Sequence, residues 1–239
     1  MKYLVPEAVT PALRTYVRTF LAPDVHTNDN GTNRYQVYTL YLDGPSLTLC
    51  RQTQQGLRNR YKLRVRWYDP APEAPAFIEI KQRTNDFIHK LRAQVTKAEM
   101  QQIVHGGYLS LTEQNRDHSI ADVIGEFCER RDRLMASEIV LVSYTREAYE
   151  SSLGNHIRVT FDREIWGRAC RNDHEPLSPE RHREVSNGQV VMEIKFTKEM
   201  PGWIHDFIQS FQLTRVSFPK YVACVENLGL LATPQTTRI

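Results

Sequence analysis

The chain has 239 residues, of which 41% are hydrophobic and 25% charged, and its formal net charge at pH 7 is +3. This balance excludes bulk disorder, and the length is enough to bury a core without disulfide or metal support. We expect one domain over residues 1–230 and a polar tail at 231–239. Because 31 Lys and Arg residues nearly balance 28 Asp and Glu residues, an anion-binding role requires the cations to be gathered in one place.

The cysteines and the N-terminal segment predict a cytoplasmic protein. Cys50, Cys128, Cys170 and Cys224 lie far apart, form no CxxC pair and follow no secretory leader, which is typical of reduced, buried thiols. No apolar run of 18 residues occurs, so no membrane segment is expected.

The first half of the chain combines two predicted helices with three predicted strands. An amphipathic helix is expected over 10–21, with Thr10 as its N-cap. Alternation of apolar and polar residues then predicts strands at 36–43, 61–68 and 77–81. Thr96 and Glu99 have the spacing of a capping box, which predicts a helix over 96–104.

The second half begins with the longest predicted helix, over 119–135, where apolar residues recur at helical spacing. Alternation resumes in predicted strands at 140–146, 157–162 and 190–196. An apolar stripe after Pro201 and Gly202 predicts a last helix over 203–211. The order of the strands suits an antiparallel meander.

Charged residues gather on one face of these strands, because side chains alternate across a strand. In the strand at 61–68 the charged face carries Lys62, Arg64 and Arg66. The later strands add Glu79, Lys81, Arg83, Arg158, Glu193 and Lys195. A column of like charges two residues apart is mildly unfavourable unless an anion lies among its members.

These charged faces have two interpretations. A sheet with one solvent-exposed face explains any single strand, since Lys and Arg keep a surface soluble. The recurrence of Arg, Lys and Glu favours a closed antiparallel β-barrel of about eight strands, whose charged interior is a water-filled tunnel. Arg binds phosphate oxygens with a bidentate fork, and carboxylates beside phosphates hold Mg²⁺ or Mn²⁺. We therefore expect a mainly β, α+β fold that binds a phosphate chain with divalent metal.

The chain also carries an ordered set of short motifs. They are Lys2-Tyr3, YLD at 41–43, LRVRWYD at 63–69, EIK at 79–81, IRVTFD at 157–162, EIK at 193–195 and SFPKY at 217–221. From residue 2 to about 226, this set resembles the VTC domain of the triphosphate tunnel metalloenzyme (CYTH-like) superfamily. The resemblance implies an antiparallel β-tunnel and the synthesis of polyphosphate from ATP, with transfer of a terminal phosphoryl group onto a phosphate chain in the tunnel.

The resemblance also implies roles for single residues. Those that match the family's phosphate-binding cations are Lys2, Arg64, Arg66, Lys81, Arg158 and Lys220. Further phosphate-binding candidates are Lys62, Arg83, Lys195, Tyr144 and Lys90, with Arg92 as an alternative to Lys90. Glu193 matches the metal-binding glutamate, and Glu79 is expected to support it. Lys81 and Lys195, with the clamp of Arg64 and Arg66, are the expected catalytic residues, acting by positioning and charge neutralisation.

Three functions stay open at this point. The polymerase is favoured because the ExExK signature of the superfamily's hydrolases is absent near Lys2. A hydrolase of tripolyphosphate, polyphosphate or nucleoside triphosphates is the nearest alternative, and a non-catalytic module that binds polyphosphate is the third. No specific nucleic acid partner is expected, because no known binding motif occurs. Protein partners cannot be named from the sequence.

Overall fold

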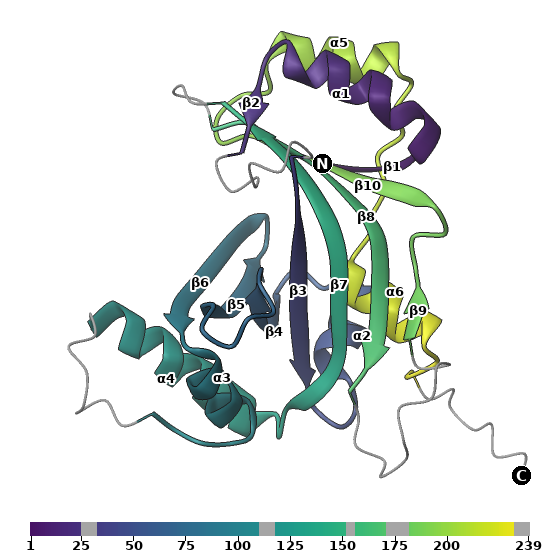
Figure 1. Cartoon of the computed structure of the whole chain (residues 1–239). Helices are drawn as coiled ribbons and strands as arrows, with labels where there is room; N and C mark the ends of the chain where they lie inside the picture. Colours follow the sequence, from purple (N-terminus) through teal and green to yellow (C-terminus); the bar gives the residue numbers. More distant parts are fainter. Residues whose placement is uncertain (25–32, 110–117, 152–155, 171–181, 232–239) are drawn as a thin grey trace, which may run out of the picture. The chain divides into compact units, whose positions relative to one another are not determined.

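The computed structural model describes residues 1–24, 33–109, 118–151, 156–170 and 182–231 (Figure 1). The predicted polar tail lies outside these residues, apart from Leu231. Among the described helices, none is both long and apolar enough to cross a lipid bilayer.

A ten-stranded antiparallel sheet forms most of the structure. Its strands are β1 Lys2–Pro6, β2 Ala22–Pro23, β3 Arg34–Asp43, β4 Arg60–Trp67, β5 Ala76–Thr84, β6 Phe87–Val95, β7 Ser137–Glu150, β8 Arg158–Ala169, β9 His182–Glu184 and β10 Gln189–Lys195. The main path runs β1-β10-β8-β7-β3-β4-β5-β6, while β2 pairs with β7 and β9 with β8. The mainly β class is therefore confirmed. Within the described residues the path is open, since no hydrogen-bonded pairing joins β6 to β1.

Of the described helices, four connect strands along the chain and two follow the last strand. They are α1 Thr10–Arg18, α2 Thr48–Gln54, α3 Lys97–Val104, α4 His118–Arg133, α5 Gly202–Ser210 and α6 Lys220–Asn227, with a 3₁₀ turn at Glu7–Val9. The capping box of α3 is confirmed: the Glu99 amide donates to Thr96 Oγ1 at 3.2 Å, and the Thr96 amide donates to Glu99 Oε2 at 2.8 Å. The prediction that Thr10 is the N-cap of α1 is wrong. Because the 3₁₀ turn runs directly into α1, Val9 is the N-cap and Thr10 is already helical.

Several elements were not predicted from the sequence. Strand β6 is exposed over its first four residues, so this half lacks the apolar alternation that marks a strand. Helix α2 is short and polar, and a residue that precedes the helix stabilises its first turn. The buried Asp43 carboxylate accepts hydrogen bonds from the backbone amides of Leu49 and Cys50 at 3.0 and 2.8 Å.

The chain forms two compact units, each assembled from segments distant in sequence. Unit 1 contains Met1–Val37, Ser143–Trp166 and Glu184–Pro219, and unit 2 contains Tyr38–Val142, Gly167–Arg183 and Lys220–Ile239. Each unit has its own hydrophobic cluster.

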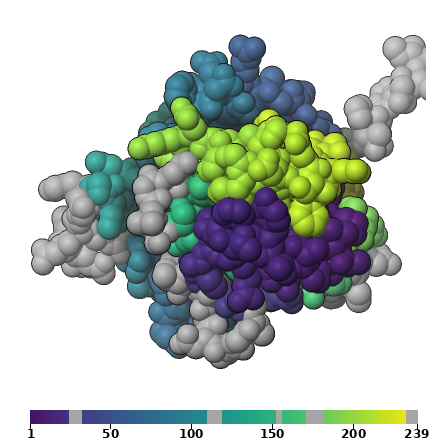
Figure 2. Space-filling view, turned by 90° about the horizontal axis from the view of Figure 1, so that it is seen from above, coloured from purple at the N-terminus to yellow at the C-terminus, as the bar shows by residue number. Residues whose placement is uncertain are grey.

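The core of unit 1 lies between helices α1 and α5 and one face of strands β1, β8 and β10. Figures 1 and 2 show α1 and α5 side by side, and ring stacking between Phe20 and Trp203, with centroids 4.6 Å apart, joins the two segments. Buried residues of the strands are Tyr3, Val5, Val159, Phe161, Val190, Met192 and Ile194. Since these residues alternate along their strands, their neighbours stand on the opposite face.

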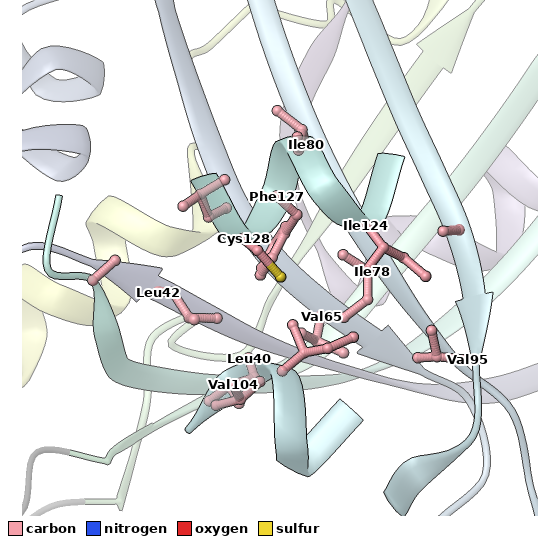
Figure 3. Close-up of a cluster of buried hydrophobic side chains, with 14 of the residues drawn as sticks. Leu40, Leu42, Val65, Ile78, Ile80, Val95, Val104, Ile124, Phe127 and Cys128 are labelled. Carbon is pink, nitrogen blue, oxygen red and sulfur yellow. The ribbon is translucent and has the colours of Figure 1, made fainter. Parts of the chain in front are cut away.

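The core of unit 2 lies between helices α3 and α4 and one face of strands β4, β5 and β6 (Figure 3). Its strand residues include Leu63, Val65, Ile78, Ile80, Ala93 and Val95, and α4 contributes Ile124, Phe127 and Cys128. The same alternation places the charged residues of these three strands on the face away from this core.

Candidate functional site

The charged face of strands β4, β5 and β6 in unit 2 is here called the cation face. Its charged members are Arg60, Lys62, Arg64, Arg66, Glu79, Lys81, Arg83, Lys90 and Arg92. The residues between them pack into the core of unit 2, so the strand pattern itself brings these side chains to one surface. Lys220, the first residue of α6, belongs to the same unit but not to these strands.

Strand register arranges the cation face in rows across the strands. Lys62 is opposite Lys81, which is opposite Lys90, so three lysines stand in one row. Directly opposed side chains in antiparallel strands have Cβ atoms about 4.5–5.5 Å apart, and like charges at that separation are destabilising. The row therefore concentrates positive charge on one surface of unit 2.

The neighbouring row contains Arg64, Glu79 and Arg92, and Glu79 is its centre. The Glu79 residue is 1% exposed, and its Oε2 lies 2.7 Å from both Nε and Nη2 of Arg64. Its Oε1 lies 3.5 Å from Arg92 Nε and 3.8 Å from Lys90 Nζ. Burial alone would raise the pKa of Glu79, but the surrounding cations, Arg64 foremost, lower it below its ordinary value. Glu79 is therefore an ionised carboxylate that orders three cations.

The other cations of this face have different surroundings. Arg66 Nε donates to Thr39 Oγ1 at 3.1 Å, which holds its guanidinium beside β3. Arg92 stacks on the Phe77 ring, with its guanidinium carbon 3.6 Å from the ring centroid. Arg83 is drawn to the β5–β6 turn, where its Nε donates to the Asn85 carbonyl at 2.7 Å.

Lys62 and Lys90 stand at the two ends of the lysine row. Lys62 Nζ lies 5.9 Å from the centroid of the Tyr221 ring. Burial and the neighbouring guanidinium groups lower the pKa of Lys90, although Glu79 acts in the opposite direction. Burial is the largest of these influences on the pKa of Lys90.

Unit 1 has its own charged face on strands β1, β10, β8 and β7, here called the mixed face. Its members are Lys2, Tyr144, Arg146, Arg158, Thr160, Asp162, Glu193 and Lys195. Lys2 is opposite Glu193, which is opposite Thr160. Register thus brings the predicted metal ligand beside a predicted phosphate-binding lysine, with Lys195 Nζ 3.7 Å from Glu193 Oε1.

Acidic residues engage both arginines of the mixed face. Arg158 donates to Glu150 Oε2 at 2.8 Å and also contacts Asp24. Arg146 forms two hydrogen bonds with the fully buried Asp162, at 2.6 and 2.8 Å. A phosphate that approaches Arg158 must therefore compete with these carboxylates for the guanidinium group, or bind it together with them.

Tyr144 and Lys2 have defined partners on the same face. The Tyr144 hydroxyl accepts a hydrogen bond from Arg146 Nη2 at 3.3 Å, so it borders the Arg146–Asp162 pair. Lys2 Nζ donates to the Phe218 carbonyl at 2.8 Å. The sequence did not predict the stacking of Arg92 on Phe77 in unit 2 or the Arg146–Asp162 ion pair in unit 1. Both contacts depend on pairing between separate strands.

In the part of the chain that the structure describes, a divalent metal would have few protein ligands. Within the described residues, no group of three or more His, Cys, Asp or Glu side chains is placed to hold a metal ion. Mg²⁺ and related cations are often held by one or two carboxylates, with waters and phosphate oxygens as the other ligands. Glu193, the predicted metal ligand, has a side chain that is 17% exposed, and it lies opposite Thr160, whose buried hydroxyl has no hydrogen-bond partner among the described residues.

Comparison with known proteins places the chain in a family. The similar solved structures include the PH1819 protein of Pyrococcus horikoshii OT3, which is 13% identical and has a TM-score of 0.39, with 88% of this chain and 85% of that chain covered. They also include a putative adenylyl cyclase, HpAC1, of Hippeastrum. HpAC1 is 14% identical and has a TM-score of 0.47, with 88% of this chain and 84% of that chain covered, and it is described as having a dominant triphosphatase activity. No curated protein sequence matches. The family model of the VTC domain matches residues 1–228, and the chain therefore belongs to the VTC domain family.

Proposed function

We propose that this protein binds ATP and polyphosphate and transfers the terminal phosphoryl group of ATP onto a phosphate chain. The observation that carries the proposal is the charge of the cation face. Eight cationic side chains of β4, β5 and β6 share this face with a single carboxylate, that of Glu79. Such a surface is stabilised by a bound polyanion, and membership of the VTC domain family supports a phosphate chain as that polyanion.

Within this proposal, each group on the cation face has a distinct task. Arg64 is pre-oriented by Glu79 and Arg66 by Thr39, so both guanidinium groups can bind phosphate oxygens without a large loss of side-chain entropy. Lys81, at the centre of the lysine row, neutralises the charge that develops on the transferred phosphoryl group. No nucleophilic side chain is needed, because phosphoryl transfer depends on positioning and charge stabilisation.

The mixed face supplies further candidates for the same chemistry. Lys2, Arg158 and Lys195 are assigned to phosphate binding and Glu193 to the divalent metal. A divalent metal held by Glu193 would supply neutralisation of phosphate charge. Glu79 as a second metal ligand stays a prediction, and it fits less well than Glu193 because cations approach both of its carboxylate oxygens. The closed barrel predicted from the sequence is also part of this proposal.

The test is a turnover assay with the purified full chain. The protein is incubated with ATP and Mn²⁺ or Mg²⁺, and the products are separated on a gel that resolves phosphate-chain length. We expect a ladder of long chains that disappears in the double variant Arg64→Ala, Arg66→Ala. The control, Arg51→Ala with Arg133→Ala, removes the same charge from exposed positions on α2 and α4 and should keep the ladder.

The other outcomes assign the protein differently. Orthophosphate as the sole product, lost in the Arg64, Arg66 variant, would overturn transfer to a phosphate chain and identify a hydrolase. Retained ATP or tripolyphosphate binding without turnover would identify a binding module. Equal behaviour of the two double variants would refute the role of the cation face in any of these functions.

A further inference from the structure

The hydroxyl of Thr160 is buried on the mixed face without a hydrogen bond. The residue is 4% exposed, and its Oγ1 is one of three buried side-chain nitrogen or oxygen atoms without such a partner in the described part of the chain. The other two belong to guanidinium groups of Arg92 and Arg163, which form other polar contacts. Of the three, Thr160 alone has its entire polar group unsatisfied.

A buried hydroxyl without a partner is unfavourable, because burial removes its hydrogen bonds to water. Buried polar groups in proteins nearly always have a partner in the protein or an ordered water. Valine, which carries a methyl group in place of the hydroxyl, is at least as suitable for a strand and would avoid this penalty. The flanking residues Val159 and Phe161 point into the core of unit 1, so the hydroxyl stands on the mixed face. Since no described protein group bonds to it, its partner is a water or a ligand from outside the chain.

The group beside this hydroxyl is the carboxylate of Glu193. Thr160 and Glu193 are directly opposed across the β8–β10 pair, a position in which Cβ atoms lie about 4.5–5.5 Å apart. The next acidic residue along this face of β8, Asp162, is already bound by Arg146 through two hydrogen bonds. On the other side of Thr160, Arg158 is bound by acidic residues. A ligand of Thr160 would therefore lie against Glu193.

We propose that Thr160 accepts a hydrogen bond from a water molecule of a divalent cation held by Glu193. A threonine hydroxyl has two acceptor lone pairs, and cations of the Mg²⁺ class retain several waters when one carboxylate binds them. Groups that orient such outer ligands change metal affinity by about 10–100-fold. Thr160 is thus a positioning residue for the cation. The proposal rests on the proposed function only in its choice of Glu193 as the metal ligand.

The experiment measures Mn²⁺ binding without turnover. Free Mn²⁺ is followed by electron paramagnetic resonance during titration of the full chain, with no nucleotide or phosphate present. Thr160→Val should weaken Mn²⁺ binding by about 10-fold or more, and Glu193→Gln should abolish it. Thr160→Ser keeps the hydroxyl and should bind like the original chain. Thr10→Val, the same change at a buried threonine of α1 in the same unit, should leave binding unchanged.

Thermal unfolding of the metal-free variants separates this role from a structural one. Thr160→Val should have a Tm equal to or above that of the original chain, because it removes an unsatisfied buried hydroxyl. A lower Tm that Thr160→Ser restores would show a structural hydroxyl and overturn the proposal.

Two further results would also overturn it: unchanged Mn²⁺ affinity in Thr160→Val, or Mn²⁺ binding that does not depend on Glu193. If the expected binding pattern holds while ATP yields no product, the cation site stands and the proposed transferase function falls. If product forms but Mn²⁺ binding does not depend on Thr160 or Glu193, the transferase function is supported and the cation site is refuted.

Discussion

Replacement of Glu79 by glutamine removes the one carboxylate that orders the cations on β4, β5 and β6. In the folded chain both guanidinium nitrogens of Arg64 that face Glu79 lie 2.7 Å from its Oε2. Glutamine has nearly the same shape and keeps one acceptor oxygen, but it carries no charge. The substitution therefore tests the electrostatic role of Glu79 with little change in packing.

The expected loss of stability follows from burial. The Arg64 and Glu79 side chains are 11% and 1% exposed, and breaking a buried pair from one side costs about 3–5 kcal/mol. The Arg92 and Lys90 side chains are 31% and 46% exposed, so their pairs with Glu79 are screened and add about 0–1 kcal/mol each. Because glutamine keeps one hydrogen bond to Arg64, we expect a loss of about 3 kcal/mol, a decrease in Tm of roughly 6–12 °C.

The assay is thermal unfolding followed by circular dichroism over a range of pH. Since the pKa of Glu79 is lowered in the folded chain, its contribution is complete above its unfolded value of about 4.3 and is lost as the pH falls toward the folded value. The difference in Tm between Glu79→Gln and the original chain should therefore be full at neutral pH and shrink at acidic pH. Tripolyphosphate should raise the Tm of the variant more than that of the original chain, because it relieves a larger cation repulsion.

The matched control is Glu129→Gln on α4, which removes an ion pair with Arg133 whose side chains are 64% and 70% exposed. We expect it to change stability by no more than about 1 kcal/mol. If Glu79→Gln unfolds within the range of this control at neutral pH, the cations on the cation face do not depend on Glu79. A Tm difference that grows as the pH falls would also refute the reasoning.

Two further substitutions and one chemical modification have defined expected outcomes. Lys81→Met should weaken tripolyphosphate binding about 10-fold or more in calorimetric titration, because a hydrogen bond to a charged group contributes about 1.5–3 kcal/mol; equal affinity would remove Lys81 from the site. Thr96→Ala should cost about 1 kcal/mol in urea denaturation, since the Glu99 amide loses its capping oxygen, and no loss would show that the cap is dispensable. Burial raises the pKa of the Cys50 and Cys224 thiols to about 12, so a disulfide reagent at pH 8 should modify them only in unfolded protein; rapid reaction in folded protein would contradict their burial.

Strand faces and one helix start could be predicted from neighbouring residues alone. Leu63 and Val65 are buried in unit 2 while Arg64 and Arg66 stand on the other face, as the alternation indicated. The capping box at Thr96 could be predicted because it depends only on the residue three positions later, Glu99. The wrong assignment of Thr10 as an N-cap has a local cause too, because a 3₁₀ turn before α1 left no break in the helical backbone.

The rows of the candidate site could not be predicted in this way. A shift of two residues between β4 and β5 would keep every side chain on its face, yet Lys81 would then oppose an arginine instead of Lys62. Strand β6, which brings Lys90 and Arg92 to Glu79, is half exposed and carried no clear signal.

The amino-acid sequence by itself determined the mainly β class, the two faces of each strand and the family, because alternation and short motifs are local properties of the chain. Only the tertiary structure decided which charges meet: the lysine row, the enclosure of Glu79 by three cations, and the pairing of Thr160 with Glu193. The physical reason is that strand register depends on hydrogen bonding and packing between strands, some of them far apart in sequence. The alternation of side chains stays the same when the register shifts by two residues, so it does not reveal the register.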